Sequence, residues 1–396
     1  MRNPRILLFL SLLLVTFSKS YSQSGTALPF LMINPSPTAT AMGDIGAAFN
    51  TDDAFNIALN PAHIGGLSRE HNLSASVLIG DDYFYDKSDI GLQFGMDLSK
   101  LTGLPLHAGI GILSQKIDLG EFTRTGADGH VIGKFKADES GNAIAIGASI
   151  DYFVEISVGL TYKFLNSTLT PSNDNGFIGN AKAGAFDAGI LFSIPVLDNV
   201  TIVGDLNTVI KANAGFALMN MGSEIEFGDE KDPLPYYGRL GYSITADLKL
   251  PVNNIEFSIL QIDWTADTKE YLVNRDSLSF SYRSPFSQMN LPENLILLNR
   301  KDNNVQVGYG IRLTAFETIS YMTGNYENNL VNFSSSGIGI SSKGILKFLS
   351  SSMDDDILKF ISNYFEISFI NSNVPNYFSS TANITTVNLK INNINL

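Results

Sequence analysis

Apolar residues that recur at every second position are the feature that most constrains the fold of this chain. The clearest run covers residues 156–164, where the apolar residues are Ile156, Val158, Leu160, Tyr162 and Phe164. Successive side chains of a β-strand point to opposite faces, so such a run has one apolar face and one face of polar residues or glycine. Five further runs are as regular, at 90–98, 106–112, 186–192, 240–248 and 305–313.

Eight weaker runs lie between these six, at 73–79, 144–150, 200–206, 214–221, 255–264, 319–323, 365–370 and 385–396. Segments rich in Gly, Pro, Asn and Asp, such as Asp198-Asn199 and 251–254, separate neighbouring runs as turns. Within 255–264 the apolar parity changes at Ile259-Leu260, which one extra residue in a β-bulge would explain. The sequence therefore predicts about fourteen strands.

Two architectures suit such strands: a soluble β-sandwich and a transmembrane barrel. The outward face of a sandwich strand is mostly charged or hydroxylated, whereas the second face here is mostly glycine with scattered charges. A barrel that spans a membrane turns its apolar face to lipid and its polar face to the lumen, and small residues suit a crowded lumen. We therefore predict an all-β fold, a transmembrane antiparallel β-barrel over residues 73–396.

The N-terminus indicates export. Arg2 and Arg5 precede a short apolar run that extends to Phe17. The small residues Ser20 and Ser22 occupy the two positions before the cleavage site that a signal peptidase recognises. This pattern is typical of a cleaved signal peptide, residues 1–22, and the run is too short for a membrane-spanning helix. The alternatives are an N-terminal anchor or a buried helix. Together with the barrel, the signal predicts the bacterial outer membrane as the location.

Composition narrows the chemistry. The chain has no cysteine, which excludes disulfides and thiolate metal sites. Without residues 1–22 it has 23 Lys and Arg against 39 Asp and Glu, a net charge of −16 that argues against nucleic acid and against a basic patch for anionic lipid. No later window holds about 20 consecutive apolar residues, so no helical membrane span is expected.

Three segments do not have the pattern of strands. Residues 25–71 are rich in Ala, Pro and Asn and precede the first run. Residues 274–304 are hydrophilic and predict a long loop with one short helix. Residues 350–363 predict a short amphipathic helix that begins after Ser352, with the acidic triplet 354–356 in its first turn, where carboxylates complement the helix dipole.

The first of these segments is similar to the N-terminal signature of a known family. Residues 30–33, 39–48 and 52–62, which include Gly43-Asp44 and Asn60-Pro61-Ala62, resemble that of the PorV/PorQ outer-membrane barrels, within the wider fatty-acid-transporter (FadL-like) superfamily. Three later stretches are similar too: 145–164, 215–222 with Asn220-Met221-Gly222, and 233–241 with Pro235 and Arg239. The resemblance covers about two thirds of the mature chain. It departs from the family at Leu59, where an aromatic is usual, and at the terminal Leu396, where Phe is usual.

The resemblance implies about fourteen strands around an N-terminal plug, residues 23–72, inside the lumen. We expect six residues to fold the plug or to gate the lumen: Met42, Gly43, Asp44, Asn60, Pro61 and Ala62. Plain turn chemistry is the alternative, because glycine permits positive φ and Asn before Pro starts a turn.

The sequence does not predict an enzyme. Hydrolysis by a barrel needs a nucleophile with a base beside it, and none of the four histidines, His63, His71, His107 and His130, belongs to a recognisable motif. We place His63 and His71 in the plug and its exit, His107 on the inner face of a strand, and His130 in a glycine-rich loop. The triplet 354–356 could bind a cation, although helix capping explains it as well. No cofactor and no metal are expected.

Aromatic residues between the first two runs are the candidate partner contact. Tyr83, Phe84 and Tyr85 stand in a tight acidic and aromatic cluster. An aromatic girdle at the membrane interface is the alternative, and the position near a strand end favours it.

Three functions remain open. By resemblance, the leading hypothesis is type IX secretion, in which the barrel binds the C-terminal signal domain of secreted cargo or carries the cargo from the translocon to the attachment complex. Translocon subunits are then possible partners, and the extracellular loops, including residues 274–304, would form the contact surface. The alternative is FadL-like passive uptake, with a hydrophobic small molecule in the lumen and plug residues around Gly43 and Asn60 that move to release it. A purely structural or adhesive barrel is the third. Outer-membrane lipid is a partner in every case.

Overall fold

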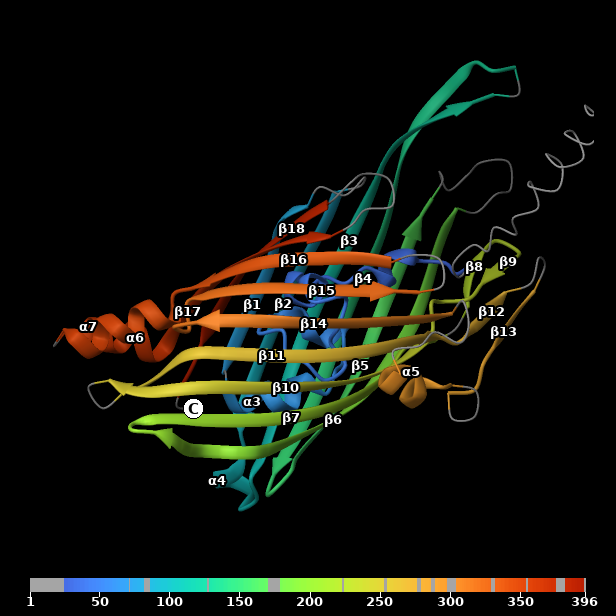
Figure 1. Cartoon of the computed structure of the whole chain (residues 1–396). Helices are drawn as coiled ribbons and strands as arrows, with labels where there is room; N and C mark the ends of the chain where they lie inside the picture. Colours follow the sequence, from blue (N-terminus) through green and yellow to red (C-terminus); the bar gives the residue numbers. More distant parts are fainter. Residues whose placement is uncertain are drawn as a thin grey trace, which may run out of the picture.

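The chain folds into a closed β-barrel, as the computed structural model shows (Figure 1). The structure describes residues 25–394, apart from 71, 82–85, 127, 170–178, 223, 253–254, 276–278, 286–288, 298–303, 329–331, 354 and 375–381. Within these residues, fourteen antiparallel strands form the barrel, and β1 pairs with β18 to close it. The predicted transmembrane antiparallel barrel is confirmed.

Neighbouring strands of the barrel follow one another in the chain, apart from short strands that lie outside it. The barrel strands are β1 (Leu73–Asp81), β2 (Asp86–Asp97), β3 (Leu106–Thr125), β4 (Val131–Asp151), β5 (Glu155–Thr168), β6 (Asn180–Val203), β7 (Leu206–Gly222), β10 (Tyr237–Val252), β11 (Ile255–Tyr271), β14 (Val305–Ala315), β15 (Ile319–Glu327), β16 (Asn332–Ser341), β17 (Phe365–Val374) and β18 (Ala382–Ile391).

The barrel is apolar on its outside. In β5 the five apolar residues of the 156–164 run are 36% to 55% exposed, whereas Ser157, Thr161 and Lys163 are at most 6% exposed. A soluble β-sandwich would bury the apolar set, so this pattern excludes it. An exposed belt of Ile, Val, Leu and Phe that surrounds a closed sheet is what lipid contact requires.

One predicted strand was wrong and one strand was missed, and the two errors cancel in the count. The run 200–206 is no separate strand: β6 extends to Val203, the chain turns at Gly204-Asp205, and Asp198-Asn199 lies within β6. β16 was not predicted, because Ser334, Ser335 and Ser336 interrupt its alternation.

The predicted bulge is confirmed. Leu248 of β10 pairs with Leu260 of β11, whereas Lys249 pairs with Ser258. Ile259 is therefore the extra residue, at the position where the apolar parity changes.

The two ends of the barrel differ. At one end the short connections 152–154, 204–205 and 316–318 join strands, and we call it the turn end. At the other, the loop end, residues 223–236 hold β8 (Ile225–Phe227) and β9 (Glu230–Asp232), and 272–304 hold β12 (Val273–Arg275), β13 (Phe280–Tyr282) and α5 (Leu291–Leu297). Outer-membrane barrels have short periplasmic turns and longer extracellular loops, and in such a membrane the turn end would face the periplasm.

The helices agree with the predictions in part. The helix expected within 274–304 is α5, and the one expected within 350–363 is α7 (Asp356–Tyr364). Asp355 caps α7, because its carboxylate accepts hydrogen bonds from the Ile357 and Leu358 N–H groups, whereas Ser352 ends the unpredicted α6 (Lys343–Ser352). A further short helix, α4 (Ser99–Thr102), joins β2 to β3. In the described part of the chain, every helix is too short or too polar to cross a membrane.

Residues 25–70, which we call the luminal segment, lie inside the barrel (dark blue in Figure 1). They form η1 (Pro29–Met32), α2 (Pro37–Ala41), η2 (Ala54–Ala58) and α3 (His63–Glu70). α2 packs against β15 to β18, whereas α3 packs against β2 to β5. The segment therefore contacts two groups of strands that lie on either side of β1. The predicted signal peptide, residues 1–22, lies outside the described residues and stays a prediction.

Candidate functional site

Glycines of the inner wall let the luminal segment approach the strands at backbone distance. A Cβ atom on Gly159 would lie 2.2 Å from the Pro61 carbonyl oxygen, and one on Gly215 would lie 2.0 Å from that of Ala47. Similar close approaches occur along the wall at Gly91, Gly95, Gly189, Gly308, Gly310 and Gly324. These distances are shorter than any that a real Cβ atom keeps from a neighbouring atom, so these positions require glycine. The glycine face of the sequence pattern is thus the surface that receives the segment.

Met42, Gly43 and Asp44 lie against β14 and β15. Met42 is fully buried, and a Cβ on Gly43 would lie 2.3 Å from the Asn325 carbonyl oxygen. Gly43 has a φ of 87° and Asp44 a φ of 58°, so the chain makes its turn here in the left-handed region. The turn chemistry expected of Gly43 is confirmed.

Asp44 joins this turn to the wall. Its carboxylate lies 2.7 Å from the Lys269 ammonium and 2.9 Å from the Gln306 side-chain amide, and it also accepts a hydrogen bond from Asn34. Burial works to raise the pKa of Asp44, but Lys269 and Arg239 outweigh it and hold that pKa below its ordinary value. Asp44 is therefore a charged anchor of the luminal segment.

Residues 45–48 form a strap that is held from both sides. From the wall, the Asp267 carboxylate accepts hydrogen bonds from the Gly46 and Ala47 N–H groups at 2.8 and 2.9 Å. The buried Arg239 guanidinium lies 3.0 Å from Asp267 and donates to the Asp44 carbonyl at 2.6 Å.

Asn60 and His63 hold the strap from within the segment. The Asn60 amide donates to the Ala47 carbonyl at 2.7 Å, and the His63 ring contacts the Gly46 carbonyl at 2.9 Å. The Asn60 side chain also accepts from the Ala62 N–H, while Pro61 lies on Gly159. The two predicted groups, 42–44 and 60–62, therefore contact different walls and meet only through the strap.

Two buried titratable groups of the segment have displaced pKa values. Burial raises the pKa of Asp53 to about 6, although Ser36, Thr51 and the Phe55 N–H donate hydrogen bonds to its carboxylate. Burial lowers the pKa of His63 to about 4, and the nearby Arg239 adds to the effect. Both side chains are thus kept largely uncharged inside the lumen in mildly acidic solution.

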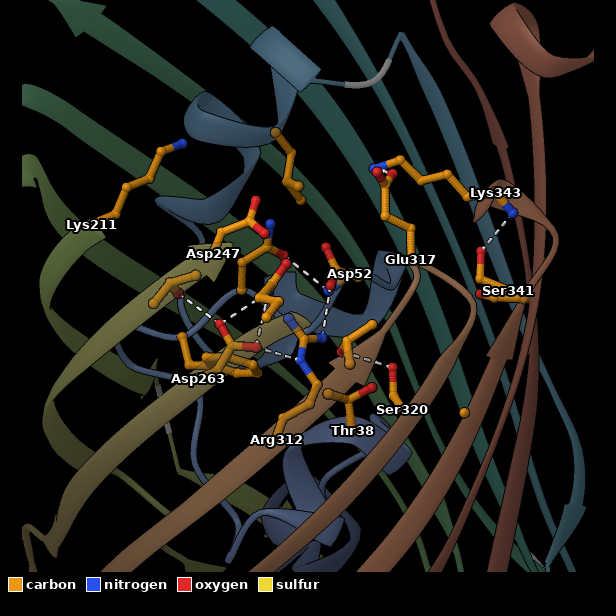
Figure 2. Close-up of a pocket in the computed structure, with 18 of the residues that line it drawn as sticks. Thr38, Asp52, Lys211, Asp247, Asp263, Arg312, Glu317, Ser320, Ser341 and Lys343 are labelled. Atoms are coloured by element: carbon orange, nitrogen blue, oxygen red, sulfur yellow. Dashed lines mark hydrogen bonds and ion pairs between the residues drawn. The ribbon is translucent and has the colours of Figure 1, made fainter. Parts of the chain in front are cut away.

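A cavity of about 620 Å³, which we call the vestibule, lies between the luminal segment and the turn end. Arg312 lies at its inner limit between Asp263 and Asp52, at 2.8 Å from each carboxylate (Figure 2). Charged side chains of both signs line the rest of the cavity, including the lysines Lys211 and Lys249 and the carboxylates Asp247 and Glu317. These charged groups suit water and ions, and apolar side chains such as Phe49 and Ile370 complete the lining of the vestibule.

An apolar cluster lies in the half of the lumen nearer the loop end. Near the loop end, Leu28 and Phe30 of the luminal segment, each 1% exposed, pack into what we call the apolar seat: Ile117, Leu165, Ala181, Ala185, Ile225 and Leu234. One backbone hydrogen bond, from the Ala27 N–H to the Pro233 carbonyl at 3.0 Å, joins this part of the segment to a loop. Leu28 and Phe30 of the chain itself therefore fill the apolar seat.

The remaining predicted residues lie outside the described part of the chain or on β3 and the loop that follows it. Tyr83, Phe84, Tyr85 and His71 lie outside the described residues, so their proposed roles stay predictions. His107 faces inward from β3, as expected, and His130 lies in the 126–130 loop. The described residues hold no cluster of three or more His, Cys, Asp or Glu side chains that could bind a metal.

The wall charges that hold the segment were not predicted. Asp263, Asp267, Lys269 and Arg312 received no role, and Arg239 was noted only as part of the family resemblance. The sequence feature that could have identified them is a charged residue on the inward face of an otherwise regular strand. A charge that faces the lumen needs a partner there.

No family model matches the chain, and no curated protein does. The PorV/PorQ resemblance is therefore not confirmed. Among solved structures, the chain is similar to the toluene transporter TbuX of Ralstonia pickettii, with 12% identity, a TM-score of 0.41, and coverage of 90% of this chain and 97% of that chain. It is also similar to the toluene transporter TodX of Pseudomonas putida (12%, 0.37, 89% and 96%) and to the translocator domain of the autotransporter NalP of Neisseria meningitidis (9%, 0.35, 83% and 88%). Likenesses this distant do not identify a ligand.

Proposed function

We propose that this chain is an outer-membrane channel for passive uptake of hydrophobic small molecules, with the apolar seat as its binding site. The observation that carries the proposal is the seat itself. A water-filled pore has a polar inner wall, whereas here three strands turn Ile117, Leu165, Ala181 and Ala185 inward near the extracellular mouth. An apolar concave site with few polar groups is the usual form of a hydrophobic ligand site.

Residues 27–33 are suited to give way to such a ligand. They hold only the single turn η1, and Leu28 has a φ of 54°, a left-handed conformation that costs a non-glycine residue about 1 to 2 kcal/mol. A ligand that fills the seat would replace the buried surface of Leu28 and Phe30 and relieve this conformation. The rest of the luminal segment, including Gly43-Asp44 and Asn60-Pro61-Ala62, would act as the plug that delays passage to the periplasm.

Binding of a plain hydrophobic probe tests the proposal. Barrels in lipid nanodiscs should bind radiolabelled naphthalene above the background of empty nanodiscs, and Leu165→Asn should weaken that binding at least tenfold because it places an amide in the seat. Leu191→Asn is the matched control, since Leu191 is an equally inward leucine that borders the vestibule. Equal naphthalene binding by the two variants would refute the seat as the site.

Cargo binding in protein secretion is a second candidate, and one observation favours it. The β3–β4 hairpin extends beyond both neighbouring strands, so that residues 119–137 pair only with each other (Figure 1). On it Phe122, Val131 and Ile132 are about half exposed or more, and Ile296 of α5 is 77% exposed. Such apolar side chains outside a membrane suit a protein partner.

Mass spectrometry under native conditions separates the two candidates. A lipid or another apolar molecule that leaves the barrel on activation supports uptake, whereas a co-purifying translocon subunit or secreted protein supports secretion. Deletion of the gene adds a second measurement: under the secretion hypothesis cargo disappears from the cell surface and accumulates in the periplasm. Normal surface cargo would leave uptake as the remaining candidate.

A further inference from the structure

The helical hairpin between β16 and β17 has an apolar side that the barrel does not cover. Helices α6 and α7 project from the turn end (left in Figure 1). On α6, Ile345 and Phe348 are 51% and 57% exposed, and on α7, Ile357 and Phe360 are 70% and 54% exposed. Spacings of three residues place each pair on one face of its helix.

A neighbouring side of α6 is fixed to the rim of the barrel. The Lys347 ammonium lies 2.7 Å from Glu317 in the β14–β15 turn and 5.3 Å from the centre of the Phe257 ring. Gly344 allows close contact, because a Cβ there would lie 1.8 Å from the Phe316 carbonyl oxygen. The hairpin is therefore held against the rim by a side of α6 that differs from its apolar side.

That apolar side is continuous with the lipid-facing belt. The Phe360 ring lies 4.7 Å from the Tyr364 ring and 6.1 Å from the Phe365 ring, measured between centroids. Phe365 begins β17, where the next outward residues, Ile367 and Phe369, are 46% and 52% exposed. The outward column of the strand thus extends onto the helix without a polar interruption.

We propose that α6 and α7 lie in the periplasmic leaflet of the membrane, with Phe348, Ile357 and Phe360 among the phospholipid chains. Amphipathic helices with large apolar residues on one face bind in the interface between headgroups and acyl chains. Continuity with the belt selects lipid as the occupant over a periplasmic protein or a second copy of the chain. The hairpin then anchors the barrel at a fixed depth, whatever the lumen transports.

Tryptophan quenching tests the depth of the hairpin. The chain has one tryptophan, Trp264, so Trp264→Phe gives a silent background for single probes. Phe360→Trp reports on α7, Phe369→Trp is the lipid-facing control, and Tyr282→Trp in the extracellular β13 is the aqueous control. Each variant is reconstituted in phosphatidylcholine vesicles whose acyl chains carry bromine, a contact quencher of tryptophan.

The proposal predicts quenching at position 360 at least half as strong as at position 369, and little at position 282. Quenching at 360 no stronger than at 282 would overturn it. An unquenched probe whose emission shifts to the blue with rising protein density would also overturn it, because a second copy would then cover the face. Should Phe360→Trp fail to assemble, judged by loss of heat-modifiable electrophoretic mobility, Ile357→Trp provides the same readout.

Discussion

The two parts of the luminal segment differ in what holds them in the barrel besides apolar contact. Residues 27–33 depend on apolar contact of Leu28 and Phe30 with the seat. Residues 36–68 also bury apolar side chains such as Met42 and Phe55 against the wall, but they depend in addition on buried ion pairs, hydrogen bonds and backbone contact with glycines of the wall. Apolar contact is non-directional, and another apolar molecule can replace it. Buried ion pairs and backbone contacts are specific in geometry, and few ligands could reproduce them. The first part is therefore suited to exchange with a ligand, and the second to permanent closure.

The largest effect is expected from the buried arginine. Arg239→Met should leave Asp267 and the Asp44 carbonyl without their cation and cost about 3 to 5 kcal/mol. Hydrogen exchange of peptides from residues 36–68 should accelerate at least a hundredfold. Lys134→Met is the control, because its ion pair with Glu121 is also short but exposed, and exposed pairs contribute little to stability.

Phe30→Ala should affect the other part and leave the ion pairs intact. Truncation of a buried phenylalanine costs about 3 kcal/mol, so the seat would be free more often and naphthalene affinity would rise up to about a hundredfold. Met42→Ala, in the permanently docked part, should not change that affinity. Similar affinity gains in both variants would remove the distinction between the two parts.

Gly159→Val tests the backbone contact. Its Cβ would overlap the Pro61 carbonyl, and overpacking of this kind costs about 1 to 3 kcal/mol. Exchange near residues 60–62 should rise while heat-modifiable mobility of the barrel is retained. Gly133→Val, a β4 position with no atom near the added Cβ, should match the wild type.

The smallest effect at neutral pH is expected at His63. Its lowered pKa means that stability is complete above pH 6.5 and falls as pH decreases toward 4, by on the order of 3 kcal/mol. Asp53 acts in the opposite sense, because its raised pKa adds stability as pH falls from about 6 toward 3.8.

His63→Gln keeps a donor for the Gly46 carbonyl and removes the first effect. Exchange of residues 36–68, corrected for its intrinsic pH dependence, should then slow from pH 6.5 to 4. Asp53→Asn should show the reverse slope. Equal pH profiles in both variants would contradict the assigned pKa shifts.

The barrel wall was predictable because its rule is local. Alternation within one strand, as in 156–164, decides which residues face lipid, and the parity change at Ile259 marks a bulge without knowledge of any partner. Contacts of the luminal segment depend on residues far apart in the chain: Asp44 and Lys269 are separated by 225 positions. Gly43 and Asn60 were singled out by the family resemblance, with turn chemistry as the alternative. Asp267 and Arg239, which bind the chain between them, depend on which strands the closed barrel places beside the segment.

A reversible lock on residues 27–33 tests the exchange most directly. Because the chain has no cysteine, Ala27→Cys with Pro233→Cys introduces a single possible disulfide, at two residues that a backbone hydrogen bond already joins. We predict that the oxidised double variant binds naphthalene at least tenfold more weakly than the single variants, and that a reductant restores binding. Undiminished binding by the oxidised protein would show that hydrophobic molecules do not enter the apolar seat in place of the N-terminal residues.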